Sequence, residues 1–187
     1  RQEENYARDS MRGFLGTVYR MTRLATRLGK WPLLLELVNG VLRQRVKLGQ
    51  PPAEALNLAE ERLEKHGLTA FDALNAEARD QVVSRTLEVS LELLSEEEPV
   101  RYSELAIFPK NKDIPLKAVA RLWGATGGLD DFDTEELCGY LFDLSLLRRF
   151  VPSTQSIELH DVVQGYLAQQ LGDRLSTLHS RLVEAYA

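Results

Sequence analysis

Apolar residues recur at three- and four-residue spacing through most of the chain, and this period is typical of amphipathic helices. The first such stripe ends before Gly29, a residue suited to the left-handed conformation that often follows a helix. Pro32 suits the first turn of the next helix, where its missing N–H leaves no donor unpaired. A third helix is expected between Pro52 and Gly67. The short connections predict a helical bundle over residues 12–66.

Helical spacing continues through the second half of the chain as far as about residue 146. We expect a helix over residues 77–94. Residues 95–98, with the sequence Ser-Glu-Glu-Glu, have the form of a capping box that opens the next helix. Pro115 begins a short helix, and residues 133–136, Asp-Thr-Glu-Glu, have the form of a second capping box. The three helices expected after residue 94 therefore each have their own start signal.

The hydrophobic period changes to two after residue 146. Residues 147–151 and 157–159 alternate apolar and polar positions on either side of a turn, which predicts a β-hairpin. Asp161 is the expected N-cap of the helix that follows, and a last helix follows Gly172. Helices, a hairpin and further helices give residues from about 86 to 171 the layout of a winged-helix domain.

The expected fold class is therefore mostly α: a helical bundle followed by a winged-helix domain with one β-hairpin wing. We expect two domains. Residues 1–68 form a helical subdomain, and residues 69–187 form a winged-helix subdomain with C-terminal helices.

Composition and charge exclude several classes of protein. The 187 residues are 44% hydrophobic and carry a net charge of −5, so we do not expect a nucleic-acid partner. The apolar runs are too short to span a bilayer, and we expect no membrane partner. One cysteine, Cys138, excludes an internal disulfide and suits a reducing, cytoplasmic compartment. Because the chain begins at Arg1 without a Met or a signal segment, we expect it to be part of a longer protein.

Motifs of known catalysts are missing from the sequence. There is no phosphate-binding P-loop motif, no G-x-S-x-G and no H-E-x-x-H. One Cys and three scattered His exclude a Cys/His zinc cluster, so we expect no metal. Paired acidic residues lie beside turns and helix starts, where capping and the helix dipole explain them. We therefore expect no catalysis from this chain by itself, and nucleotide hydrolysis by a longer protein stays an open question.

Two separated segments carry the most specific pattern. Residues 28–40 read Leu-Gly-Lys-Trp-Pro-Leu-Leu-Leu-Glu-Leu-Val-Asn-Gly, and residues 159–163 read Leu-His-Asp-Val-Val. Between them lie Leu-Ala-Ile-Phe-Pro at 105–109 and Ile-Pro at 114–115. In this order and separation, the chain resembles the C-terminal half, helical plus winged-helix subdomains, of an NB-ARC nucleotide-binding switch of the STAND class, of the bacterial repeat-containing type. The resemblance covers nearly all of residues 20–187.

The resemblance implies a role for five residues. In this family a Gly-x-Pro segment packs against adenine and ribose, which implies nucleotide contacts for Trp31 and Pro32, although Gly-x-Pro is stretched here by one residue. A Met-His-Asp motif follows the wing, and its histidine contacts the β-phosphate of ADP, which implies that role for His160. Asp161 would brace this region. Leu159 stands in the Met position, a swap of similar volume.

The function implied by the resemblance is regulatory. The fragment would help to bind ADP and would hold a closed, inactive state until nucleotide exchange and oligomerisation. ADP or ATP would bind only with an upstream P-loop nucleotide-binding domain, which these residues do not contain. The implied partners are that domain, a downstream repeat domain of the same protein, and further copies of the protein on activation.

Two other functions stay open. The first is a winged-helix DNA-binding domain of a transcription regulator. Its recognition helix would be residues 134–146, which offer Glu135, Glu136 and Asp143, with cations only at Arg148 and Arg149. The second is a protein-interaction module without a working nucleotide site. In that case Trp31 packs at a helix start, and His160 and Asp161 serve only the strand end and the helix cap.

Overall fold

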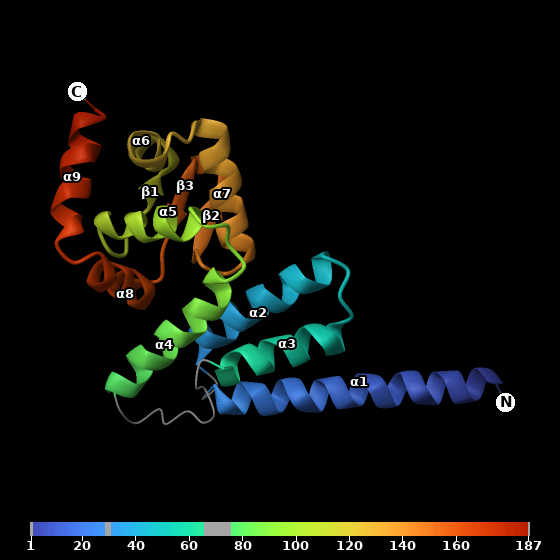
Figure 1. Cartoon of the computed structure of the whole chain (residues 1–187). Helices are drawn as coiled ribbons and strands as arrows, with labels where there is room; N and C mark the ends of the chain where they lie inside the picture. The colour runs from blue at the N-terminus through green and yellow to red at the C-terminus, as the bar shows by residue number, and fades with distance from the viewer. Residues whose placement is uncertain (1, 29–30, 66–75, 187) are drawn as a thin grey trace. The chain divides into compact units, whose positions relative to one another are not determined.

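The structure, a computed structural model, describes residues 2–28, 31–65 and 76–186. It divides the chain into two compact units, Arg1–Val89 and Ser90–Ala187 (Figure 1). The described part is mostly helical with a small antiparallel sheet, so the predicted fold class is confirmed. The domain boundary expected between residues 68 and 69 lies outside the described residues and stays a prediction.

In the described residues of the first unit, the chain forms the helices α1 (Gln2–Arg27), α2 (Pro32–Lys47), α3 (Pro52–Lys65) and α4 (Ala76–Leu91). Helix α4 runs two residues past the end of this unit. Pro32 lies at the start of α2, as its position in the sequence predicts. The core of this unit is formed by completely buried leucines of α2 and α3, among them Leu34, Leu37 and Leu56. The expected helix ends at Gly29 and Gly67 lie outside the described residues.

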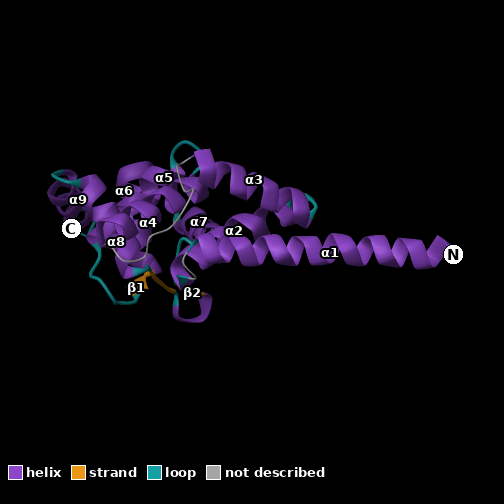
Figure 2. Ribbon diagram, turned by 90° about the horizontal axis from the view of Figure 1, so that it is seen from below, coloured by secondary structure: helices purple, strands orange, loops and turns teal. Residues whose placement is uncertain are grey.

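Helix α1 is longer than the sequence pattern suggests, because it begins at Gln2 and not near residue 12. Its N-terminal part extends beyond the ends of α2 and α3 (Figures 1 and 2). Near its C-terminus, Leu24 and Leu28 are buried. Arg20 pairs with Glu60 of α3, and Arg27 pairs with Glu64 at 3.2 Å. These contacts fix the C-terminal part of α1 against α3.

The second unit has the order of a winged-helix fold. Helix α5 (Glu98–Glu104) and the short helix η1 (Leu105–Ile107) precede β1 (Ile114–Pro115), α6 (Leu116–Gly127) and α7 (Asp131–Asp143). The wing is β2 (Arg149–Val151), a turn η2 (Pro152–Thr154) and β3 (Ser156–Glu158). Helices α8 (Asp161–Leu171) and α9 (Arg174–Glu184) complete it.

The sheet of the second unit has the strand order β1-β3-β2, with both pairs antiparallel. The predicted hairpin is confirmed as β2 and β3, in which Phe150 lies opposite Ile157. The third strand was not predicted: Ile114 and Pro115 pair with Ile157 and Ser156 on the other edge of β3. Strand β3 is therefore the central strand, held on both edges, and its end at Glu158 leads directly into residues 159–161.

Two buried aromatic side chains tie the second unit together. The Tyr102 hydroxyl donates to the carbonyl of Leu146 at 2.8 Å, and burial raises the pKa of this phenol. The Trp123 indole N–H donates to the carbonyl of Arg101 at 2.9 Å. Both rings are completely buried. Each ring donates its polar hydrogen to a backbone carbonyl, so the core holds a Tyr and a Trp without an unpaired donor.

Two helix starts differ from the predicted capping boxes. Helix α7 begins at Asp131, and its box is formed by Asp130 and Asp133: the Asp133 amide donates to Asp130 at 2.8 Å, and the Asp130 amide donates to Asp133 at 3.3 Å. Asp133 is therefore the second member of a box that begins three residues earlier than predicted. At residues 95–98 one of the two predicted bonds is present: the Ser95 amide donates to the Glu98 carboxylate at 2.7 Å. The predicted cap by Ser95 is wrong, because α5 begins at Glu98 and its N-cap residue is Glu97.

Candidate functional site

His160 lies between the wing and helix α8. It follows Leu159 after β3, and its backbone is extended, with φ −72° and ψ 132°. Its carbonyl accepts the first helical hydrogen bond, from the Gln164 amide at 2.8 Å. His160 is therefore the N-cap residue of α8 by backbone geometry, although its half-buried side chain does not cap the helix. The prediction that Asp161 is the N-cap is wrong, because Asp161 is already the first helical residue.

The two residues on either side of His160 differ in burial, with Leu159 buried and Asp161 exposed. Leu159 is buried in the core of the second unit, at 2% exposure. Asp161 is exposed in the first turn of α8, where the helix dipole favours a negative charge. The amides at this end of a helix have no partner within the helix, which makes such a position favourable for an anion. Leu159 thus anchors the segment, and the histidine stands beside an anion-favouring helix start.

Helix α8 is oriented by the segment 105–109 that the sequence pattern singled out. The Gln164 side chain donates to the Phe108 carbonyl, and the His179 ring of α9 is hydrogen-bonded to the Ile107 carbonyl at 3.1 Å. Val163 of α8 is completely buried. No sequence pattern marks Gln164 as a positioning residue, because a glutamine in a helix is usually solvated. Its bond fixes α8, and with it the backbone at His160.

The other predicted site residues lie at the start of α2. Trp31 is the N-cap of this helix, with φ −74° and ψ 121°, and its carbonyl accepts the Leu35 amide at 3.1 Å. Its side chain is half-buried, and Pro32 is exposed at the first helical position. An apolar cavity of about 340 Å³ lies between α1 and α2 and is lined by residues that include Leu28 and Leu35, but not by Trp31 or Pro32.

The five predicted residues fall into two groups, one in each unit. Trp31 and Pro32 are adjacent in the first unit, and Leu159, His160 and Asp161 are adjacent in the second. Each group occupies the same kind of position, the residues at which an extended segment becomes a helix. In the described ranges, no three His, Cys, Asp or Glu side chains gather where they could hold a metal ion. Together the two groups contain an imidazole, the amides of two helix starts, and apolar rings.

The surface of the winged-helix-like unit does not favour contact with DNA phosphates. Four carboxylate residues in the first two turns of α7, where a recognition helix would lie, are exposed: Asp131, Asp133, Glu135 and Glu136. Arg148 of the wing pairs with Glu158 at 3.0 Å, and Arg149 pairs with Glu158 at 3.2 Å and with Asp113. The cations of the wing are thus compensated within the fold.

None of the helices within the described ranges has the length and hydrophobicity that crossing a bilayer requires.

Comparison with known proteins finds a distant relative. No family model matches the chain. The chain is 25% identical over 157 residues to apoptotic protease-activating factor 1 of Danio rerio. This match covers 83% of the chain but only 11% of the relative, so the chain spans about a ninth of that protein's length. The match supports a distant NB-ARC-like relationship.

Proposed function

We propose that this chain is the regulatory, C-terminal part of a STAND-class nucleotide switch, which helps to bind ADP and keeps the protein closed and inactive until nucleotide exchange and oligomerisation. The observation that carries the proposal is the position of His160, a half-buried imidazole at the end of the wing and at the first turn of α8. The distant match to apoptotic protease-activating factor 1 supports the same class.

Each group of predicted residues contacts one part of the nucleotide in this proposal. Trp31 and Pro32, with their apolar rings, contact adenine and ribose. His160 donates a hydrogen bond to the β-phosphate, and the amides at the start of α8 favour the same anion. Leu159 holds the histidine from the core, and Asp161 braces the first turn of α8. These residues fit a nucleoside diphosphate, since they offer apolar surface in one group and donors for an anion in the other.

The histidine cannot close the switch by itself. A hydrogen bond to a charged group contributes about 1.5–3 kcal/mol. Moving a two-state equilibrium from 1:99 to 99:1 takes about 5.5 kcal/mol. The remainder has to come from surface that the second unit buries against the nucleotide-binding domain. His160 therefore reports the phosphate state, and the larger contact supplies most of the stability of the closed form.

The proposed partners follow from the same class of protein. An upstream P-loop domain would provide the main phosphate site, and a downstream repeat domain would sense a signal. On activation, copies of the protein would assemble with one another. We propose a cytoplasmic location, which suits a chain with one free, buried cysteine.

The test is the affinity for ADP of a longer protein that includes the upstream domain. His160→Ala is expected to weaken ADP binding about ten- to a hundredfold, the equivalent of one charge-assisted hydrogen bond. His160→Gln, which keeps a donor, should recover part of this loss. Asp173→Ala, an exposed substitution before α9, serves as the surface control. Unchanged affinity in both His160 variants would remove the mechanism.

A further inference from the structure

The solvent-facing side of helix α7 carries aromatic side chains that the second unit leaves uncovered. Phe132, in the first turn of α7, is 75% exposed. Phe142, about 15 Å further along the helix axis, is 39% exposed, and its ring lies 6.3 Å from that of Phe150 of β2, centre to centre. We infer that this side of α7 is the docking site for a basic amphipathic segment of a partner protein. The inference stands apart from the proposed nucleotide function.

The charge around Phe132 selects the kind of partner. Glu135 and Glu136, three and four residues later, share the helix face of Phe132 and are both exposed. Within the described residues, neither of these carboxylates forms an ion pair. Helix α7 has five Asp and Glu among its 13 residues and no Lys or Arg. An acidic surface around exposed aromatic rings complements a cationic, partly apolar ligand and repels an anionic one.

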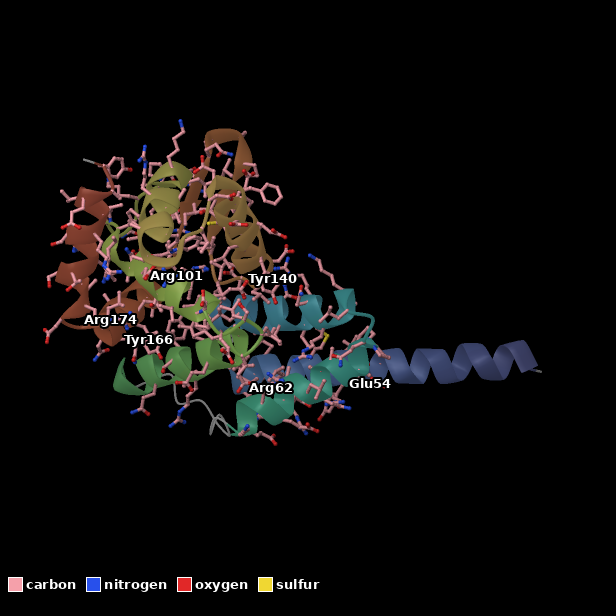
Figure 3. All side chains as sticks on the ribbon, turned by 45° about the horizontal axis from the view of Figure 1, so that its top comes forward. Glu54, Arg62, Arg101, Tyr140, Tyr166 and Arg174 are labelled. Atoms are coloured by element: carbon pink, nitrogen blue, oxygen red, sulfur yellow. The ribbon has the colours of Figure 1, made fainter. Side chains whose placement is uncertain are left out.

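A cavity of about 330 Å³ lies beside this face, between α5 and α7, and provides a place for a cationic side chain. Four carboxylate residues line it: Glu97, Glu98, Asp133 and Glu136. Arg101 and Tyr140 line it from α5 and α7 (Figure 3). Arg101 pairs with Glu104 at 3.1 Å, so its charge is already compensated inside the unit. The four carboxylates therefore leave the cavity negative, which favours a guanidinium or an ammonium group.

The combination of carboxylates and aromatic rings fits arginine in particular. A guanidinium group can bind a carboxylate through two parallel hydrogen bonds, and it also stacks on an aromatic ring. One arginine of the partner would enter the cavity beside Glu136, and a second would lie over the ring of Phe132. Apolar side chains of the same segment would cover Phe142. The surface thus offers a contact for each part of a basic amphipathic segment.

Other occupants fit this surface less well. Nucleic acids and anionic lipid headgroups carry the same sign of charge as α7 and are repelled. Pairing of this face on two copies would set five carboxylate residues against five, which like charges disfavour. A small polyamine would pair with the carboxylates but would leave the Phe132 ring in water. A protein segment with both arginine and apolar residues satisfies the charge and the rings together.

The experiment measures binding of synthetic peptides to the 187-residue chain by fluorescence anisotropy. The first peptide carries Leu at helical three- and four-residue spacing and Arg elsewhere, the second has Glu in place of Arg, and the third has Ser in place of Leu. We expect the first peptide to bind at least about tenfold more tightly than either of the others. Added salt should weaken its binding, because charge pairs contribute to it.

Substitutions on α7 test the location. Phe132→Ser should weaken binding of the first peptide at least about tenfold, and Glu136→Gln about fivefold. Both positions are exposed, so these variants should keep the fold. The matched controls lie on α9, where Val183 is 70% exposed and Glu184 is exposed. Val183→Ser and Glu184→Gln should leave binding unchanged, and Glu184→Gln alters the net charge by the same amount as Glu136→Gln.

Three results would overturn the inference. The first is that the α7 variants bind the first peptide no more weakly than the α9 controls do, which would reduce the effect to net charge. The second is equal binding of the first and third peptides, with displacement of both by spermine, which would make a small polycation sufficient. The third is dimerisation of the chain that Phe132→Ser abolishes, which would make a second copy the occupant.

Discussion

Glu104 is a carboxylate inside the second unit, at 2% exposure. It accepts a hydrogen bond from Thr126 at 2.8 Å and pairs with Arg101 at 3.1 Å. Burial raises the pKa of Glu104, and this effect outweighs the opposing effects of Thr126, Arg101, Arg174 and Arg181. Arg101 and Arg174 come from α5 and α9 (Figure 3). The charge on Glu104 therefore costs stability even though it is paired.

The pH dependence of stability tests this assignment. Because the pKa of Glu104 is higher in the folded state, its protonated form stabilises the fold. That contribution is complete below about 4.3, the ordinary pKa of glutamate, and is lost as pH rises through the raised value. Relative to the wild type, Glu104→Gln should therefore become more stable in urea unfolding as pH rises from about 4 to about 7. A difference that stays constant with pH would contradict the buried titration.

Cys138 on α7 should be unreactive in the folded chain. It is completely buried, and burial, together with the charge of Glu135, raises its pKa to about 12. Only the thiolate is nucleophilic, so at about pH 8 a thiol reagent should label the denatured chain rapidly and the native chain only at the rate of opening. Equal labelling rates in buffer and in denaturing urea would contradict this packing.

At the site itself, residue identity was more informative than local geometry. Leu159-His160-Asp161 could be singled out because the order of residues is specific. Which of the two polar residues is the N-cap could not be predicted, because Asp is a common N-cap residue and His is not. Because the His160 backbone is extended and its carbonyl accepts the first helical hydrogen bond, His160 is the N-cap residue and Asp161 is the first residue of the helix.

At the scale of elements, the cap of α7 gives a contrast that can be measured. Asp130 accepts the Asp133 amide, so Asp130→Ala should lower the free energy of unfolding by about 1 kcal/mol, the usual value of an N-cap. Ser95 was predicted to cap α5, but its bond to Glu98 uses its backbone amide. Ser95→Ala should therefore change stability by less than about 0.5 kcal/mol. Equal losses in the two variants, by chemical denaturation, would contradict these caps.

Elements could be predicted from the sequence where the hydrophobic pattern extends over enough residues to show its period. The helix start at Pro32 and the hairpin with Ile157 could both be predicted. Strand β1 could not, because the two residues Ile114 and Pro115 are too few to show a period of two, and their pairing with β3 depends on contacts far along the chain. The start of α1 was missed for a related reason: polar residues between 2 and 10 obscure the stripe, and helical propensity alone is a weak signal.

On the scale of the whole molecule, the chain has two units, and each contains one group of the predicted site residues. The order of the motifs along the sequence indicated both groups, but no local pattern specifies how two folded units meet. In the proposed mechanism, the first unit provides apolar contacts to the nucleotide and the second unit provides an anion contact.

The most direct measurement is an experimental structure of the longer protein, including its upstream domain, with ADP bound. The proposed mechanism predicts a ring nitrogen of His160 within hydrogen-bond distance of a β-phosphate oxygen, about 2.7–3.2 Å, with Pro32 against the adenosine. ADP bound with the His160 ring turned into the core of the second unit, away from both phosphates, would contradict the central claim.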